Sequence, residues 1–215
     1  MDRDEQWLAI EAERRSLADL LDGLTPGQWA SPSLCTEWRV QDVAAHVAMT
    51  WRMSAGIIVT GLGRSRGDAA AFGRDLAIAD AERPPSEIVA ELRREAATRT
   101  KPFVTSVPAL LSDVIVHGQD IAVPLGIDRA TPREAAVAGF LYLWQRGWPF
   151  YPRTRLAGTQ LVATDADVAV GNGAAVEGPL SALTLLVSMR ISAAMPRLRG
   201  PGVDLVAGVQ RRLAG

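Results

Sequence analysis

The two histidines are the side chains best suited to chemistry in this sequence of 215 residues, because it contains no others. His46 lies among alanines and valines in the stretch TEWRVQDVAAHVAMTW, residues 36–51. His117 lies in the similarly apolar stretch LLSDVIVHGQDIAVPLG, residues 110–126. Neutral imidazole is the commonest metal ligand among side chains, so histidines on faces that should point inward raise the question of a metal site.

Two carboxylates accompany His117, since Asp113 lies four residues before it and Asp120 three residues after it. At about 100° per residue, these three side chains share one narrow stripe of a helix. A helix that faces a core seldom stacks polar groups on one stripe of an otherwise apolar surface without a purpose. The stripe therefore indicates a site.

Two interpretations of these residues remain open from their spacing. Two histidines and a carboxylate from facing helices form the three-ligand set of a catalytic zinc site, which leaves a fourth position for water or substrate. The same donors also suit iron(II) or nickel, so they do not choose the metal. Alternatively, each histidine is a satisfied core residue, and a His–Asp pair four residues apart is an intrahelical hydrogen bond.

The composition limits the classes of function. Hydrophobic residues make up 48% of the chain, which is enough for a core, and the net charge of -1 argues against general nucleic-acid binding. The single cysteine, Cys35, fits a reducing cytoplasm, and we interpret it as a small buried apolar residue instead of a nucleophile. The acidic N-terminus and the lack of a long apolar run predict a soluble cytoplasmic protein without a membrane partner.

The periodicity predicts a mainly α-helical chain with a small C-terminal α/β part. Apolar residues recur at helical spacing over most of residues 1–150, whereas TQLVATD and AAVEG are strand-like and flank the turn GNG. We therefore expect a helical bundle over 1–150 and an α/β appendage over 151–215. The first two expected helices cover 4–22 and 40–60, and a loop follows at 61–70. A third helix is capped by Ser86 and closed by Pro102, and a fourth covers 109–123. A capping box at 131–134 opens a fifth helix, and Pro179 opens a last one.

Three segments resemble one known family. TEWRVQDVAAHVA is similar to the W-x-V-x-D-V-x-x-H opening of the mycothiol-dependent maleylpyruvate isomerase family, which is part of the DinB-like superfamily. DVIVHGQDIAVPLG resembles the second motif of that family, and LVATDADVAVGNGAAVEGP followed by LRGPGV resembles its C-terminal segment. The resemblance spans most of the chain and implies a DinB-like four-helix bundle with a metal at one end.

The resemblance also implies a ligand set. Carried over position by position, the metal ligands are His46, Asp113 and His117. The tryptophan and aspartate of the first motif fall on Trp38 and Asp42. The family carries glutamate where this chain has Asp113. Because aspartate is one methylene shorter, the change predicts altered geometry, a weaker metal site, or a partner of His117 in place of a ligand.

The function implied by the resemblance is an isomerase or S-transferase that uses a low-molecular-weight thiol such as mycothiol on a small electrophilic substrate. A divalent metal, which we expect to be zinc, would bind the thiol as thiolate. Arg190 is a candidate to hold an anionic group, although a helix-end arginine that faces the dipole is the alternative. A non-catalytic binding bundle and a metal-dependent hydrolase remain alternatives, which metal content and thiol dependence would separate.

A charge argument supports a cation beside Asp113. A carboxylate on an inward stripe is costly to bury without a positive partner, and no arginine lies between Lys101 and Arg129. The expected partner is a metal, or else the charged form of His117.

Overall fold

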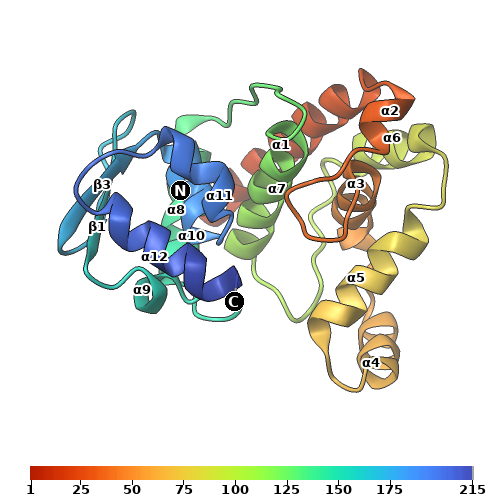
Figure 1. The fold of residues 1–215 in the computed structure, drawn as a ribbon. Coiled ribbons are helices and arrows are strands. Elements are labelled where there is room, and N and C mark those ends of the chain that lie inside the picture. Colours follow the sequence, from red (N-terminus) through yellow and green to blue (C-terminus); the bar gives the residue numbers. More distant parts are fainter. Residues whose placement is uncertain (215) are drawn as a thin grey trace. The chain divides into compact units, whose positions relative to one another are not determined.

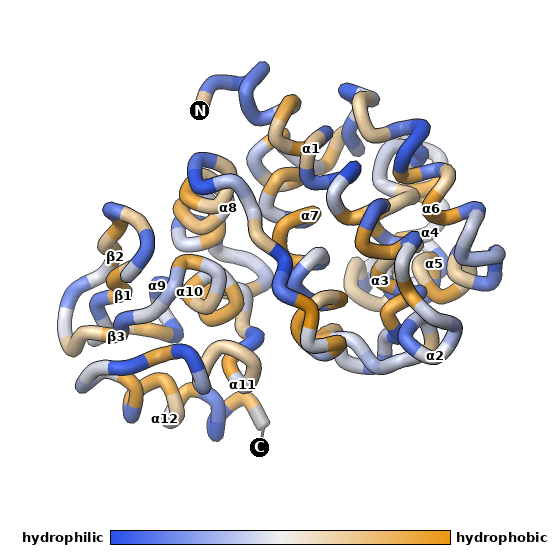
Figure 2. The backbone as a smooth tube through the Cα atoms, turned by 90° about the horizontal axis from the view of Figure 1, so that it is seen from above, coloured by the Kyte–Doolittle hydropathy of each residue, from blue (hydrophilic) through white to orange (hydrophobic). Residues whose placement is uncertain are grey.

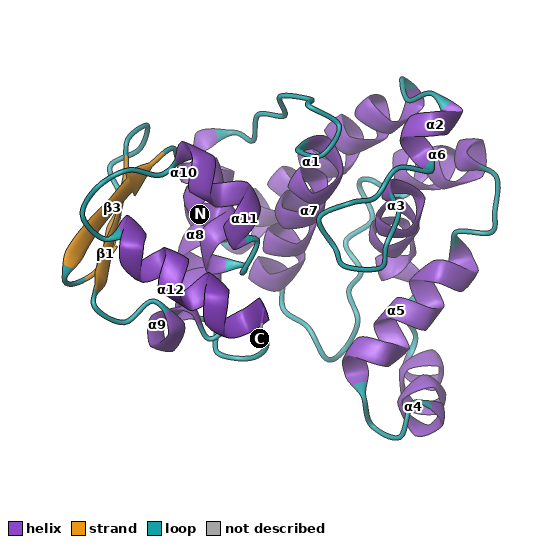
Figure 3. Ribbon diagram, in the orientation of Figure 1, coloured by secondary structure: helices purple, strands orange, loops and turns teal. Residues whose placement is uncertain are grey.

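The structure is a computed structural model that describes residues 1–214, and it contains two compact units. The first unit is Asp2–Ala130, which is helical, and the second begins at Thr131 and contains both helices and a sheet (Figures 1 and 3). The units divide earlier than the boundary predicted at residue 150. The reason is that α8 (Arg133–Gln145) packs against α10 (Leu180–Val187) of the second unit.

Four helices of the first unit form a bundle. Both α1 (Arg3–Asp22) and α3 (Val40–Met49) pack against α6 (Pro85–Arg94) and α7 (Val107–Ala122). Their apolar faces meet in one core, to which Leu17, Val43, Val47, Ile88 and Val114 belong. The predicted four-helix bundle with a small C-terminal α/β part is therefore confirmed.

The segment after α3 differs from the single helix predicted over 40–60. The α-helix ends at Met49 and continues as one 3-10 turn, η1 (Thr50–Arg52), before α4 (Ala55–Arg64) begins. The Thr50 hydroxyl donates to the Val47 carbonyl, and the Ser54 side chain accepts from the Ile57 amide to start a new helix. Local side-chain hydrogen bonds thus compete with helix continuation here.

Other predicted boundaries also shift. The expected loop at 61–70 is mostly helix, because α4 reaches Arg64 and α5 (Ala69–Asp80) begins after the cap Asp68. Ser86 lies inside the first turn of α6, which Pro84 precedes, and that helix ends well before Pro102. α8 begins at Arg133 with Pro132 as its cap residue, one position later than a capping box opened at residue 131 predicts. A short helix, α2 (Pro26–Trp29), follows α1 and precedes α3.

The second unit contains a three-stranded sheet in the order β2-β1-β3. β1 (Thr159–Ala163) pairs antiparallel with β2 (Ala169–Gly171) and parallel with β3 (Ala174–Gly178). The predicted GNG turn joins β2 to β3, and its Gly173 has a φ of +124°, where a Cβ would lie 2.0 Å from the Gly158 carbonyl oxygen. Only glycine fits that position.

Helices complete the second unit. The buried α10 is mostly orange in the hydropathy view of Figure 2, as expected for a helix that is apolar along most of its length. The remaining elements are α9 (Pro152–Arg155), α11 (Ile191–Ala194), the 3-10 turn η2 (Met195–Arg197) and α12 (Val203–Ala214). None of the helices described is both long and apolar enough to cross a membrane.

Candidate metal centre

Helix α3 carries His46, and Asp42 fixes where that helix starts. The Asp42 carboxylate accepts the Arg39 backbone N–H at 2.7 Å and two bonds from the Arg39 guanidinium, at 2.8 and 3.1 Å. An acidic side chain in the first turn also favours the positive end of the helix dipole. The motif aspartate Asp42 is therefore a structural residue that sets the register of α3 and so the direction in which His46 points.

Helix α7 carries the polar stripe Asp113, His117 and Asp120. Its start is set by Ser106, whose side chain accepts the Ala109 backbone N–H at 3.3 Å. The apolar residues on the rest of the helix are buried, which fixes its rotation and leaves the stripe beside α3. The predicted stripe is thus real.

The structure brings His46, Asp113 and His117 together. The Oδ1 atom of Asp113 lies 3.5 Å from Nε2 of His117 and 3.8 Å from Nε2 of His46. The two imidazole centroids are 4.9 Å apart in an edge-to-face arrangement. One donor atom from each of the three residues lies within 4.8 Å of the others, and all three side chains are only partly exposed, Asp113 by 33%.

These separations fit a small tetrahedral ion. Zinc bonds of about 2.1 Å place neighbouring tetrahedral ligands about 3.4 Å apart. The separations of Asp113 Oδ1 from the two Nε2 atoms, 3.5 and 3.8 Å, are close to that edge length. The Asp113 side chain therefore reaches both histidines, although it is one methylene shorter than the glutamate that the motif resemblance implies.

The charges of the cluster are coupled. Burial raises the pKa of the Asp113 carboxyl, but the positive charge of His117 and hydrogen bonds from His117 and His46 outweigh it, and the pKa lies well below its ordinary range. Burial lowers the pKa of His117, but Asp113, together with the hydrogen bonds that His117 makes with Asp120 and Cys35, raises it well above the usual value. Without a metal, the charged His117 is the partner of Asp113, which is the alternative that the charge argument left open.

The other ring nitrogen of His117 contacts Asp120. Nδ1 of His117 lies 2.9 Å from Oδ2 of Asp120, whose side chain is 0% exposed. The Cys35 thiol donates to the same Oδ2 at 3.1 Å and lies 3.8 Å from Nδ1 of His117. Cys35 is partly buried and packs against the core, as expected, but it is also a polar neighbour of the site, which sequence reasoning missed.

Trp38, the motif tryptophan, covers both imidazoles. Its ring centroid lies 5.3 Å from that of His46 and 6.3 Å from that of His117. The loop that carries it closes on itself, since the Ser33 amide donates to the Trp38 carbonyl and the Trp38 amide to the Cys35 carbonyl. An aromatic ring at this place shields one side of the cluster from water.

A second cation lies near Asp113 that the sequence did not reveal. Arg14 of α1 is buried, and the negative charge of Asp113 acts on its guanidinium. Burial lowers the pKa of Arg14, while Asp113 and Glu95 oppose that effect. Arg14 is distant from Asp113 in the sequence, so the charge argument, which considered the stretch around Asp113, did not include it.

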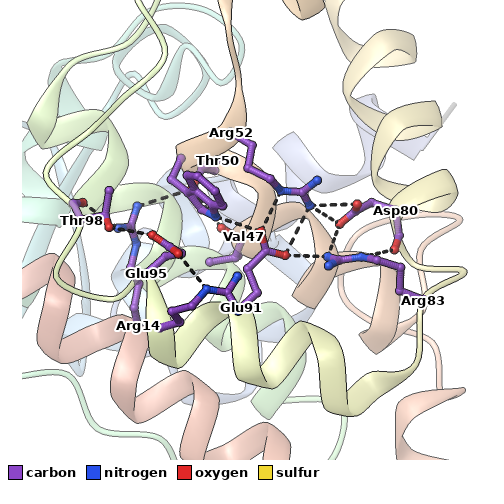
Figure 4. Close-up of polar contacts among 11 residues, drawn as sticks. Arg14, Val47, Thr50, Arg52, Asp80, Arg83, Glu91, Glu95 and Thr98 are labelled. Atoms are coloured by element: carbon purple, nitrogen blue, oxygen red, sulfur yellow. Dashed lines mark hydrogen bonds and ion pairs between the residues drawn. The ribbon is translucent and has the colours of Figure 1, made fainter.

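Ion pairs anchor the end of α3 (Figure 4). Arg52, at the end of η1, contacts Asp80 at 2.9 Å and Glu91 at 2.7 Å, and Arg83 contacts the same two carboxylates at 2.6 and 2.8 Å. Glu91 is buried and also accepts the indole N–H of Trp51 at 2.9 Å. This Arg52–Asp80–Arg83–Glu91 cluster ties the segment that follows His46 to α5 and α6.

Arg190 lies in the second unit, between α10 and α11. Its Nη1 donates to the Ser188 carbonyl at 2.7 Å, and its guanidinium lies 5.6 Å from the ring centroid of Phe150. Arg190 is partly buried, which differs from a fully solvated helix-end arginine. Its expected role in holding an anion stays a prediction.

Comparisons with known proteins give the same family as the motifs. Residues 10–109 match the family described as the mycothiol maleylpyruvate isomerase N-terminal domain. This part of the chain is therefore similar to the N-terminal domain of the mycothiol maleylpyruvate isomerases. The match includes His46, whereas Asp113 and His117 lie beyond it.

Two solved structures share the fold over nearly the whole length of the chain. A crystal structure of the mycothiol-dependent maleylpyruvate isomerase superposes with a TM-score of 0.63 at 13% identity, covering 94% of this chain and 93% of that one. A variant of that isomerase with one histidine replaced by alanine gives 0.62 at 12% identity, with the same coverage. No curated protein sequence matches the chain. The isomerase fold therefore extends over both compact units.

Proposed function

We propose that the chain is a metal-dependent enzyme that uses a low-molecular-weight thiol, mycothiol or a close analogue, either to isomerise a small electrophile or to transfer the thiol onto it. The observation that carries the proposal is the convergence of His46, Asp113 and His117 on one point of a bundle whose first part matches the N-terminal domain of the isomerase family. Three protein donors leave one position of a tetrahedral ion for an external ligand, as in catalytic zinc sites.

The residues present divide the work. His46, Asp113 and His117 would hold a divalent ion, of which zinc is the first candidate, with Asp113 in the place of the family glutamate. When bound, such an ion supplies a Lewis acid that keeps a coordinated thiol in its nucleophilic thiolate form. Trp38 shields the imidazoles, and the buried Arg14 offsets negative charge beside Asp113.

The reaction class follows from a thiolate held beside a small substrate. Addition of the sulfur to a carbon–carbon double bond makes that bond single, rotation about it exchanges the geometry, and departure of the same sulfur restores the double bond. In a transfer reaction, the sulfur instead remains attached. We propose that Arg190 holds an anionic group of the thiol or substrate, because a guanidinium binds carboxylates in a bidentate manner.

The test combines metal analysis with an activity screen. Protein purified without chelators should contain about one divalent ion per chain, and turnover of unsaturated dicarboxylates should require both the metal and added mycothiol. Turnover without any thiol would support a metal hydrolase in its place. Metal binding without turnover would support a binding protein, and a chain that retains no metal would overturn the proposal.

A further inference from the structure

Asp120 joins three parts of the site, and neither the motifs nor the proposed ligand set gives it a role. Its side chain is 0% exposed, so its carboxylate is removed from water. Oδ2 contacts Nδ1 of His117 at 2.9 Å and accepts the Cys35 thiol at 3.1 Å. A buried carboxylate is costly unless it is engaged in this manner.

We propose that Asp120 is a positioning residue that fixes His117 with its Nδ1–H toward α7 and its Nε2 toward the ion, and that holds the Trp38 loop over the same imidazole. This inference rests on the proposed metal centre and deepens it. The carboxylate is an acceptor at Nδ1, which favours the tautomer with the proton on that nitrogen. The Nε2 lone pair then faces Asp113, 3.5 Å away.

The contacts on the loop side are independent of His117. The Leu34 backbone N–H donates to the Asp120 carbonyl at 3.0 Å, and the thiol of the next residue, Cys35, donates to its carboxylate. Both donors belong to the loop whose hydrogen bonds place Trp38 over His46 and His117. One residue of α7 therefore sets the ring angle of the histidine and the position of its cover.

The first experiment uses the intact wild-type chain. With only two histidines, a 15N-histidine spectrum of the zinc-loaded protein shows two imidazoles, which single variants assign. We expect His117 to bind zinc through Nε2 and to keep a protected proton on Nδ1. Zinc bound through Nδ1 of His117 would overturn the inference.

The second experiment measures zinc dissociation constants by competition with a chelator. We expect Asp120→Ala to weaken zinc binding by about 10- to 100-fold, the usual effect of removing a carboxylate partner of a metal-bound histidine. Asp120→Asn should lose less zinc affinity than Asp120→Ala, because its amide oxygen still accepts a hydrogen bond. Cys35→Ser keeps a donor to Asp120, so its zinc affinity should stay close to that of the wild type. Cys35→Ala should lower zinc affinity, but by less than Asp120→Ala does.

Glu13→Gln is the matched control, because Glu13 is a buried carboxylate of the same unit that pairs with Arg129 at 2.7 Å and lies on α1, which carries neither histidine. It should lower the melting temperature without the loss of zinc affinity. Equal affinities for wild type and Asp120→Ala would overturn the positioning role but leave the metal centre intact. A wild-type chain that binds no zinc would overturn both.

Discussion

The two histidines of the site are held in different ways. His117 is oriented directly, because Asp120 contacts its Nδ1 while Nε2 faces Asp113. The Nδ1 atom of His46 is buried and has no hydrogen-bond partner among the described residues. His46 therefore depends on the placement of its helix, which Asp42 fixes at one end and the Arg52–Asp80–Arg83–Glu91 cluster at the other.

This difference teaches that a metal site can combine a preset ligand with an adaptable one. His117 loses little orientational freedom on binding because its ring is already fixed, whereas the His46 ring must be ordered when the ion arrives. The shorter Asp113 side chain makes the adaptable partner useful, since His46 is the more distant of the two histidines from Oδ1.

The largest effects should come from removing each histidine in turn. Both His46→Ala and His117→Ala should weaken zinc binding by more than the roughly 100-fold that outer partners contribute. Only His117→Ala should also destabilise the metal-free protein, by about 1.5–3 kcal/mol, since it removes a hydrogen bond to a charged, buried group. Chelator competition measures the zinc affinities, and urea unfolding measures the stabilities of the metal-free variants. Equal losses of stability in His46→Ala and His117→Ala would contradict the difference between the two histidines.

Asp113 comes next, because it faces both histidines. Asp113→Asn should lower zinc affinity strongly, whereas Asp113→Glu should retain it, since glutamate keeps the carboxylate that faces both histidines. Isothermal titration of zinc into the metal-free proteins gives both values. If Asn and Glu variants bind zinc equally well, Asp113 is a partner of His117 and not a ligand.

Disruption of the α3 anchor tests the dependence of His46 on its helix. Glu91→Gln removes the carboxylate charge that pairs with Arg52 and Arg83 and should cost about 3 kcal/mol of unfolding free energy. This value is at the low end of the range for breaking a buried ion pair, because both arginines are partly exposed. Zinc affinity should fall moderately as well. Glu11→Gln is the control, because its exposed pair with Arg15 is worth less than about 1 kcal/mol, and zinc affinity unaffected by Glu91→Gln would contradict the dependence.

The smallest effect concerns pH. The raised pKa of His117 stabilises the metal-free fold below the ordinary histidine value of about 6.5, and this stabilisation is lost as pH rises through the raised pKa. The lowered pKa of Asp113 adds stability above about pH 3.9 that is lost only in stronger acid. Zinc must displace the His117 proton, so zinc affinity should rise by up to about tenfold per pH unit until that pKa is passed. The melting temperatures of the metal-free and zinc-loaded proteins should therefore diverge as pH rises from about 5.5 to about 8.5. A constant difference between them would refute the raised pKa of His117.

Much of the bundle could be predicted from the sequence, because apolar periodicity follows directly from the helix repeat. The break after Met49 could not, since it depends on side-chain hydrogen bonds of Thr50 and Ser54 that compete with an otherwise helical pattern. The boundary between the units, near residue 130, could not be predicted either. The sequence predicts that α8 is a helix, but only the packing of α8 against α10 shows that it belongs to the second unit.

For the site, the sequence by itself determined the stripe Asp113, His117 and Asp120, since residues three and four apart must share a helix face. It also determined His46 as a candidate, through the motif that surrounds it. Only the tertiary structure decided that Asp113 reaches both histidines, that Cys35 contacts Asp120, and that Arg14 adds a second positive charge. These contacts join helices and loops far apart in the chain, so they depend on how the elements pack and not on any local repeat.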